Sequence, residues 1–254
     1  MRIGVIADVH GNLLALRAVL AKLKTLSCDR IVNLGACLSG PLQAAETADL
    51  LIAEDFLTVR GNHDRQLIDR PVDEMGPSDQ AAFGQLTEAH LNWLRAMPVE
   101  ARIGNIYLCH ATPRKDSAYL LETVMPETGD VRLATTDEIR TRLLGVPEDV
   151  SVVLHGHTHI PRLMSLDGRL LINPGAVGLP AYDATSTALH YMETGSPHAR
   201  FAVVTRSGTS DHNWEVQFHA IEYEWDAASE IATAGERGDW ARALATGYAL
   251  RTGS

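Results

Sequence analysis

The segment Met1-Arg2-Ile3-Gly4-Val5-Ile6-Ala7-Asp8-Val9-His10 decides the architecture that we expect of this chain. Ile3 to Ala7 is a short apolar run typical of a buried β-strand, and a polar turn follows it at once. Asn12 is suited to cap an apolar-periodic helix from Leu13 to about Leu26. A strand, a polar turn and a helix in this order begin a parallel βαβ unit, so we expect an α/β fold.

The same order repeats along the chain before it changes. Further strands are expected at Ile31–Leu34, Phe56–Val59, Ile103–Cys109 and Val150–Leu154, with helices ending near Ala53 and covering Thr136–Leu144. The pattern then becomes strand after strand. The dipeptides Asp167-Gly168 and Ser207-Gly208 are typical of tight turns and predict two hairpins, over about 162–172 and 201–222. Helices are expected to close the chain between Ala227 and Ala249.

The length of 254 residues suits one large α/β domain. No repeat, low-complexity segment or linker argues for two, so we predict a single domain over residues 1–254. Within it, residues from about 70 to 100 change to a polar, proline-interrupted sequence, which predicts a helical or irregular insertion. Residues from about 178 to 199 are expected to form an extended loop near the site.

Composition restricts the partners and the compartment. The formal net charge of −10 gives no general basic surface for a long nucleic acid, although a phosphate ester or a nucleotide is compatible with it. The three cysteines form no even disulfide framework and are expected to be reduced. No apolar run is long enough to span a membrane, and the apolar start of the chain is too short for a signal peptide. We therefore expect a cytoplasmic protein.

Six potential metal ligands follow the predicted strands, at the sheet edge where loops converge in α/β folds. They are Asp8, His10, Asn62, His110, His157 and His159. Each group alone has an ordinary structural interpretation, such as a chance pair of polar residues at a strand end. Their joint occurrence in this order favours a metal site. Mixed nitrogen and oxygen ligands suit Mn, Fe, Ni or Zn better than Mg or Ca.

The order Asp-x-His, Gly-Asn-His-Asp, His and Gly-His-x-His resembles the calcineurin-like metallophosphoesterases. Within this superfamily it is most similar to small bacterial phosphodiesterases and diadenosine-tetraphosphatase-like enzymes, over Met1 to about Leu179. The resemblance implies a four-layer α/β/β/α sandwich with a mixed, partly parallel pair of sheets. It also implies two divalent metal ions at the carboxyl ends of the strands, and Asn173-Pro174-Gly175 matches a family turn nearby.

Carried over residue by residue, the resemblance assigns Asp8, His10 and His159 to one metal. It assigns Asn62, His110 and His157 to the other. His63 would lie beside the leaving group, as general acid or as a stabiliser of the transition state. A hydroxide activated by both metals would attack the phosphorus of the ester.

The chain departs from the family at Ala36, where the pattern has an aspartate that bridges both metals. A methyl group cannot bind a metal, so we expect weaker occupancy of at least one site and a large loss of activity. Cys37 is one residue away and points to the opposite face if the chain is extended, so we expect it to pack as a small buried thiol. We favour an introduced, inactivating substitution as the explanation, for example to trap a substrate. The alternative is a naturally degenerate or one-metal enzyme.

The preferred function is therefore metal-dependent hydrolysis of a small phosphate ester, of the phosphodiester or dinucleoside polyphosphate class, by a protein that Ala36 impairs. Two alternatives remain. One is a non-catalytic protein that binds phosphate or a nucleotide, and the other is a phosphatase that acts on proteins or phosphomonoesters. The net charge argues against a nuclease acting on long nucleic acids.

Overall fold

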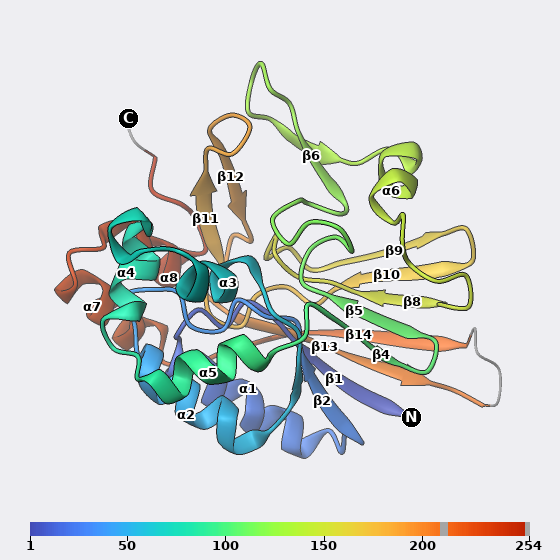
Figure 1. Cartoon of the computed structure of the whole chain (residues 1–254), viewed down its shortest axis with the longest axis horizontal. Helices are drawn as coiled ribbons and strands as arrows, with labels where there is room; N and C mark the ends of the chain where they lie inside the picture. The colour runs from blue at the N-terminus through green and yellow to red at the C-terminus, as the bar shows by residue number, and fades with distance from the viewer. Residues whose placement is uncertain (209–212, 252–254) are drawn as a thin grey trace.

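Two five-stranded sheets form the centre of the fold in the computed structural model, which describes residues 1–208 and 213–251 (Figure 1). The first sheet has the order β14-β13-β1-β2-β3 and the second β4-β5-β8-β10-β9. Strands of the first sheet are β1 (Arg2–Ile6), β2 (Arg30–Asn33), β3 (Leu57–Thr58), β13 (Ala199–Arg206) and β14 (Trp214–Ile221). Strands of the second are β4 (Glu100–Ile103), β5 (Ile106–Cys109), β8 (Val152–Leu154), β9 (Arg162–Leu166) and β10 (Arg169–Asn173).

Both sheets are mixed, as predicted. β1, β2 and β3 pair in parallel, and so do β5, β8 and β10. Antiparallel pairs complete both sheets, because β13 pairs with β1 and β14 in the first sheet, while β4 and β9 flank the second. Both predicted hairpins are confirmed by the pairs β9–β10 and β13–β14, although residues 209–212 of the second turn lie outside the described part of the chain.

Alternation of side chains along the strands explains why the sheets stack. In β1, Ile3 and Val5 point to the space between the sheets, where they meet Ile106 and Leu108 of β5 in one buried cluster. The neighbouring Ile6 faces the other side. The central strand β1 therefore buries both faces, which is typical of a sheet covered on both sides.

Helices cover the outer face of each sheet. α1 (Leu13–Thr25), α2 (Ala44–Glu54) and α5 (Glu88–Ala96) pack on the first sheet, and α6 (Thr136–Arg142) packs on the second. Figure 1 shows these layers in the order helices, sheet, sheet, helix. The predicted four-layer α/β/β/α sandwich is confirmed. The predicted cap of α1 is confirmed as well, since Asn12 Oδ1 accepts from the Ala15 N–H at 3.1 Å.

The predicted insertion at 70–100 contains a 3-10 turn at Val72–Glu74 and two helices, α4 (Pro77–Phe83) and α5. The strand expected at 103–109 is present as β5 from Ile106, whereas Ile103 ends the preceding strand β4, because the chain reverses at Gly104, whose φ is +59°. The loop expected at 178–199 is not wholly irregular. It contains the antiparallel pair β11 (Ala181–Ala184) and β12 (His190–Glu193), whose mixed polar sequence conceals the alternation.

The remaining elements are one small strand pair, the two C-terminal helices and the helix that follows β3. β6 (Glu122–Val124) and β7 (Val131–Leu133) form a small antiparallel pair in the segment between β5 and α6. Two helices close the chain as predicted, α7 (Trp225–Ala234) and α8 (Gly238–Thr246), and α8 packs near β11. α3 (Asn62–Asp69) begins directly after the β3 turn. Among the described residues, no helix has the length and apolar character needed to cross a bilayer.

Candidate metal centre

The turns after the parallel strands meet at one edge of the sheet pair and carry an unusual backbone. Positive φ angles of 52° to 71° occur there at Asp8, His10, Ala36, His157 and His159. Residues other than glycine seldom adopt this conformation, because the Cβ atom is crowded by the carbonyl oxygen. Such conformations persist where the surrounding fold enforces them, and they concentrate at functional sites.

Three predicted ligands converge in the first part of the centre. The His10 Nδ1–H donates to the Ser39 carbonyl at 2.8 Å, and the His159 Nδ1–H donates to the Leu179 carbonyl at 2.7 Å. Both Nε2 atoms therefore face inward and lie 3.2 Å apart. Asp8 Oδ1 is 3.5 Å from His159 Nε2, and all three side chains are buried.

The electrostatics of this cluster point to a cation. Burial and the neighbouring His159 lower the pKa of His10 well below its usual value, so its Nε2 carries a lone pair. Burial raises the pKa of Asp8, but the histidines around it, His159 foremost, hold that pKa well below its usual value, so the carboxylate is charged. Asp8 Oδ1 has no hydrogen-bond partner among the described residues. A buried carboxylate oxygen without a donor is costly, and a divalent cation between the three atoms would satisfy it.

A second group of ligands lies beside the first. The His110 Nδ1–H donates to the Leu34 carbonyl at 2.7 Å, which turns His110 Nε2 toward Asn62 Oδ1 at 2.8 Å. The His157 ring lies 5.1 Å from the His110 ring, and burial lowers the pKa of His157 to about 3. A neutral His157 therefore has a lone pair for a metal at neutral pH.

Asp8 connects the two groups. Its Oδ1 atom is 4.0 Å from His110 Nε2 as well as 3.5 Å from His159 Nε2. Its Oδ2 atom accepts the His157 N–H at 3.0 Å, which fixes the carboxylate. The structure thus brings together all six ligands that the sequence predicts, and their donor atoms fit divalent metals of the Mn, Fe, Ni and Zn type. The identity and the number of the ions stay predictions.

Ala36 lies within the frame of this centre, held by its backbone. Its carbonyl accepts the His10 N–H at 3.0 Å, and its N–H donates to Asp64 Oδ2 at 2.8 Å. The fully buried Asp64 also accepts from the N–H groups of Cys37 and Gly61, each at 2.8 Å. Sequence reasoning missed this role of Asp64, although its place at the third position of α3 is typical of a capping carboxylate.

Cys37 does not replace the missing carboxylate. Its sulfur is 3.3 Å from Asn33 Nδ2, and its side chain belongs to the core beneath the helices that cover the first sheet. Burial raises the pKa of the Cys37 thiol well above its usual value, so it is not a thiolate. The expectation of a small buried thiol is confirmed.

His63 lies next to the first group of ligands, with its ring 5.4 Å from that of His10. Its Nδ1 is 2.9 Å from Asp79 Oδ1, and Asp79 is buried in α4 while the His63 side chain is 32% exposed. Burial raises the pKa of Asp79, but the hydrogen bond and charge of His63 outweigh it and lower that pKa. Asp79 was not predicted, since nothing in the polar insertion distinguishes it from neighbouring acidic residues.

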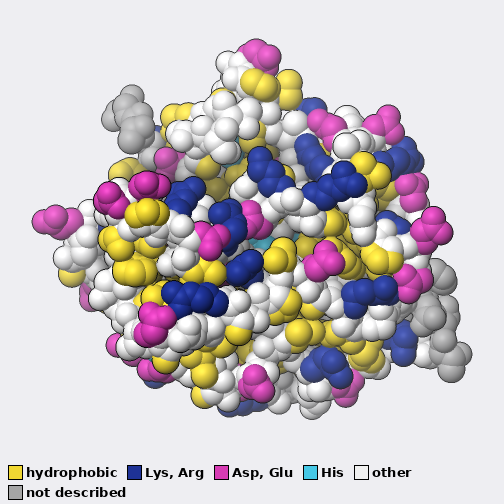
Figure 2. Space-filling model, in the orientation of Figure 1, with side chains coloured by type: hydrophobic (Ala, Val, Ile, Leu, Met, Phe, Trp, Pro, Cys, Tyr) yellow, Lys and Arg dark blue, Asp and Glu magenta, His cyan; other side chains and the backbone are white. Residues whose placement is uncertain are grey.

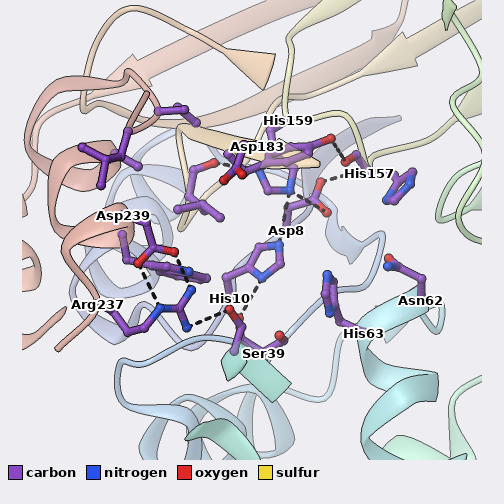
Figure 3. A pocket seen from close by; sticks show the side chains of 18 residues that line it. Asp8, His10, Ser39, Asn62, His63, His157, His159, Asp183, Arg237 and Asp239 are labelled. Atoms are coloured by element: carbon purple, nitrogen blue, oxygen red, sulfur yellow. Dashed lines mark hydrogen bonds and ion pairs between the residues drawn. The ribbon is translucent and has the colours of Figure 1, made fainter. Parts of the chain in front are cut away.

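A cavity of about 200 Å³ opens above these residues (Figure 3). Five of the six predicted ligands and His63 line it, while His110 is buried and reaches the centre beside Asn62. Figure 2 shows a histidine near the middle of this face, with Lys and Arg side chains gathered around it. The other walls come from segments that no motif identified. They include Tyr182, Asp183, Arg237, Asp239, Trp240 and Leu250.

Other polar residues near the strand ends support the centre from outside the cavity. Asn173 Nδ2 donates to the Gly156 carbonyl at 2.9 Å and to Thr158 Oγ1 at 3.0 Å, which holds the histidine turn. His190 is buried, with its Nε2 2.8 Å from Tyr119 Oη, and it does not line the cavity. Through these Asn173 contacts, the Asn-Pro-Gly turn supports the turn that carries His157 and His159.

Comparison with known proteins agrees with this geometry. The family model described as calcineurin-like phosphoesterase superfamily domain matches residues 1–195. Uncharacterized protein MJ0912 of Methanocaldococcus jannaschii is 23% identical over an alignment of 247 residues, and the alignment covers 94% of this chain and 94% of that protein. A metallophosphoesterase from Sphaerobacter thermophilus superposes with a TM-score of 0.69 and 25% identity, over 97% of this chain and 99% of the other.

The hypothetical protein PH1004 from Pyrococcus horikoshii shares the fold, with a TM-score of 0.73 and 17% identity over 98% of this chain and 99% of the other. The family match covers the segment that carries all six predicted ligands, His63 and Ala36. The alignments with the two solved structures cover 97% and 98% of this chain, so they extend past residue 195. This chain belongs to the calcineurin-like phosphoesterase superfamily.

Proposed function

We propose that this scaffold hydrolyses phosphate esters with the aid of divalent metal ions, and that its substrates are phosphodiesters or dinucleoside polyphosphates. One observation carries the proposal. Potential ligand atoms of buried side chains face one another, 3.2 Å apart for His10 Nε2 and His159 Nε2 and 2.8 Å apart for His110 Nε2 and Asn62 Oδ1, and the nearby Asp8 Oδ1 has no hydrogen-bond partner among the described residues. Family membership supports the same chemistry.

The residues of the cavity have different roles in this proposal, according to their positions. When bound, divalent ions supply positive charge that activates water and stabilises the charge developing on the phosphoryl oxygens. Asp8 and the histidines would hold those ions, and His10, His110 and His159 are each oriented by a backbone carbonyl at the Nδ1 atom. His63 faces the cavity beside them. With Asp79 at Nδ1, it can donate the proton on Nε2 to the departing alkoxide.

Ala36 impairs this chain in our proposal, because the bridging carboxylate is missing from an otherwise intact centre. A second candidate follows from the unequal ligands of the two groups. The ligand atoms of Asp8, His10 and His159 all lie within 4.8 Å of one another and include a carboxylate, whereas Asn62, His110 and His157 supply no carboxylate and Ala36 supplies none in its place. This favours a one-metal protein that binds phosphate or hydrolyses esters slowly.

The test compares the chain as it stands with Ala36→Asp. Metal content after loading with Mn²⁺ is measured by mass spectrometry, and hydrolysis is followed with an aryl phosphodiester. We expect the carboxylate to raise the metal content toward two ions per chain and to increase the rate by orders of magnitude. Ala220→Asp adds the same charge at an exposed position of β14 and should change neither.

Each outcome has a meaning. If Ala36→Asp raises neither metal content nor rate above the Ala220→Asp control, the hydrolase proposal is wrong. If one ion binds in both forms and the rate stays low, the one-metal alternative replaces it. His63→Ala in the restored protein then tests the acid, because slower turnover at unchanged metal content is expected mainly for esters with poor leaving groups.

A further inference from the structure

Helix α8 and the residues on either side of it form one wall of the cavity, although they lie beyond the segment that the family model matches. Trp240 in the first turn of α8 is buried, and its ring lies 5.9 Å from that of His10. Gly40 makes room for it, because a Cβ atom there would be 2.6 Å from the Trp240 ring. α8 is thus fixed against the candidate metal centre.

Arg237 immediately precedes α8 and lines the cavity. Its Nε and Nη2 atoms donate to the two carboxylate oxygens of Asp239 at 2.9 and 2.6 Å. Its Nη1 atom donates to Ser78 Oγ at 3.1 Å. These contacts hold the guanidinium from two sides, so its position is set before any ligand arrives. Figure 3 shows it on the same side of the cavity as His10 and Ser39.

The guanidinium retains unused donors. It has five N–H groups, of which these contacts use three. One N–H on each terminal nitrogen has no partner in the described part of the chain. Two N–H groups on neighbouring nitrogens match the spacing of two phosphate oxygens, a geometry that lysine does not offer.

Arg237 differs in charge from the other charged side chains that line the cavity. Of the described residues that line it, Arg237 is the one lysine or arginine, while Asp8, Asp183 and Asp239 are acidic. Ser78, its other partner, directly precedes Asp79, which holds His63. Arg237 is therefore linked through Ser78 to the helix whose Asp79 holds His63.

We infer that Arg237 binds phosphate oxygens of the substrate and is a specificity-determining residue of this centre. The inference rests on the proposed function for the identity of the substrate, but not for the binding of the anion. Asp239 is the positioning residue that orients the fork. The oxygens belong either to the reacting phosphoryl group or to a neighbouring phosphate of a polyphosphate.

The experiment measures binding of inorganic phosphate to the Mn²⁺-loaded protein by isothermal titration calorimetry. Arg237→Gln removes the charge and the fork, and Arg237→Lys keeps the charge alone. Arg140→Gln is a matched control, because Arg140 also donates to both oxygens of an aspartate, Asp167, but does not line the cavity. Thermal unfolding of all three variants reports any structural role.

We expect Arg237→Gln to weaken phosphate binding at least about tenfold, the effect of losing one charge-assisted hydrogen bond. Arg237→Lys should recover only part of the loss, and Arg140→Gln should bind as the unchanged protein does. If phosphate binds Arg237→Gln within a factor of about two of the unchanged protein, the inference is wrong. A lower melting temperature with unchanged phosphate affinity would assign Arg237 a structural role alone.

Kinetics in the Ala36→Asp background separate this inference from the proposed function. Arg237→Gln should raise KM more than it lowers kcat. An equal rise for an aryl phosphodiester and a dinucleoside polyphosphate places Arg237 on the reacting phosphoryl group, whereas a rise for the polyphosphate alone places it on a neighbouring phosphate. Hydrolysis with unchanged KM for both refutes the inference and leaves the proposed function intact. If Arg237→Gln weakens phosphate binding but the Ala36→Asp protein hydrolyses neither ester, the inference stands and the proposed function is wrong.

Discussion

Replacing Asp79 by asparagine tests the proposed role of His63 as the general acid. Asp79 Oδ1 lies 2.9 Å from His63 Nδ1, and the Asp79 side chain is only 3% exposed, so little water competes for it. A hydrogen bond to a charged group contributes about 1.5–3 kcal/mol. If this contribution is realised as His63 becomes the acid in the transition state, its loss slows turnover by about 10- to 150-fold.

The assay is steady-state hydrolysis by the Ala36→Asp protein, with aryl phosphodiesters that span good and poor leaving groups. We expect Asp79→Asn to lower kcat most for the poorest leaving group and to leave the metal content unchanged. Asp73→Asn is the control, since Asp73 is exposed in the same insertion. A kcat that stays within a factor of two for every ester would refute the assigned role of Asp79.

The same contact gives stability a defined pH dependence. The folded state lowers the pKa of Asp79 below its ordinary value of 3.8, because the contact with His63 outweighs the effect of burial. A group with a lowered pKa stabilises the fold above its unfolded-state pKa, and this contribution is lost as pH falls through the lower folded value. The free energy of unfolding should therefore differ most between the unchanged protein and Asp79→Asn above about pH 4. In urea titrations, a difference that grows below that pH would contradict the assignment.

Three further predictions concern the centre and the core. Mn²⁺ at 100 times its dissociation constant should raise the free energy of unfolding by about 2.7 kcal/mol, and a chelator should reverse this increase. An unchanged melting temperature would contradict the metal site. Gly61→Ala should destabilise the fold by about 1–3 kcal/mol, because the new Cβ would lie 2.4 Å from the Ala36 nitrogen. An unaltered urea midpoint would show that the turn rearranges to accept the methyl group. Phe201→Ala should cost about 3–5 kcal/mol, since Phe201 is fully buried, and a cost below 1 kcal/mol would mean that the core refills the space.

Several elements were predictable because their signals are local. The alternation of apolar strands and amphipathic helices identified β1, α1 and the hairpin β9–β10, and Asn12 marked the start of α1. The division of 103–109 into β4 and β5 was missed because one glycine turn decides it. The pair β11–β12 was missed because short strands with polar side chains carry little periodicity.

The sequence by itself predicted the six candidate ligands, His63 and the gap at Ala36, because each candidate ligand closely follows a recognisable strand end and their order resembles the family pattern. Only the tertiary structure decided which residues complete the centre. Asp64, Asp79 and Arg237 come from a helix start, an insertion and the C-terminal region, and their roles depend on contacts between segments as far apart as Ser78 and Arg237. A carboxylate or a guanidinium looks the same in sequence whether it faces solvent or a buried partner. Its environment sets its pKa and its free donors, and folding alone creates that environment.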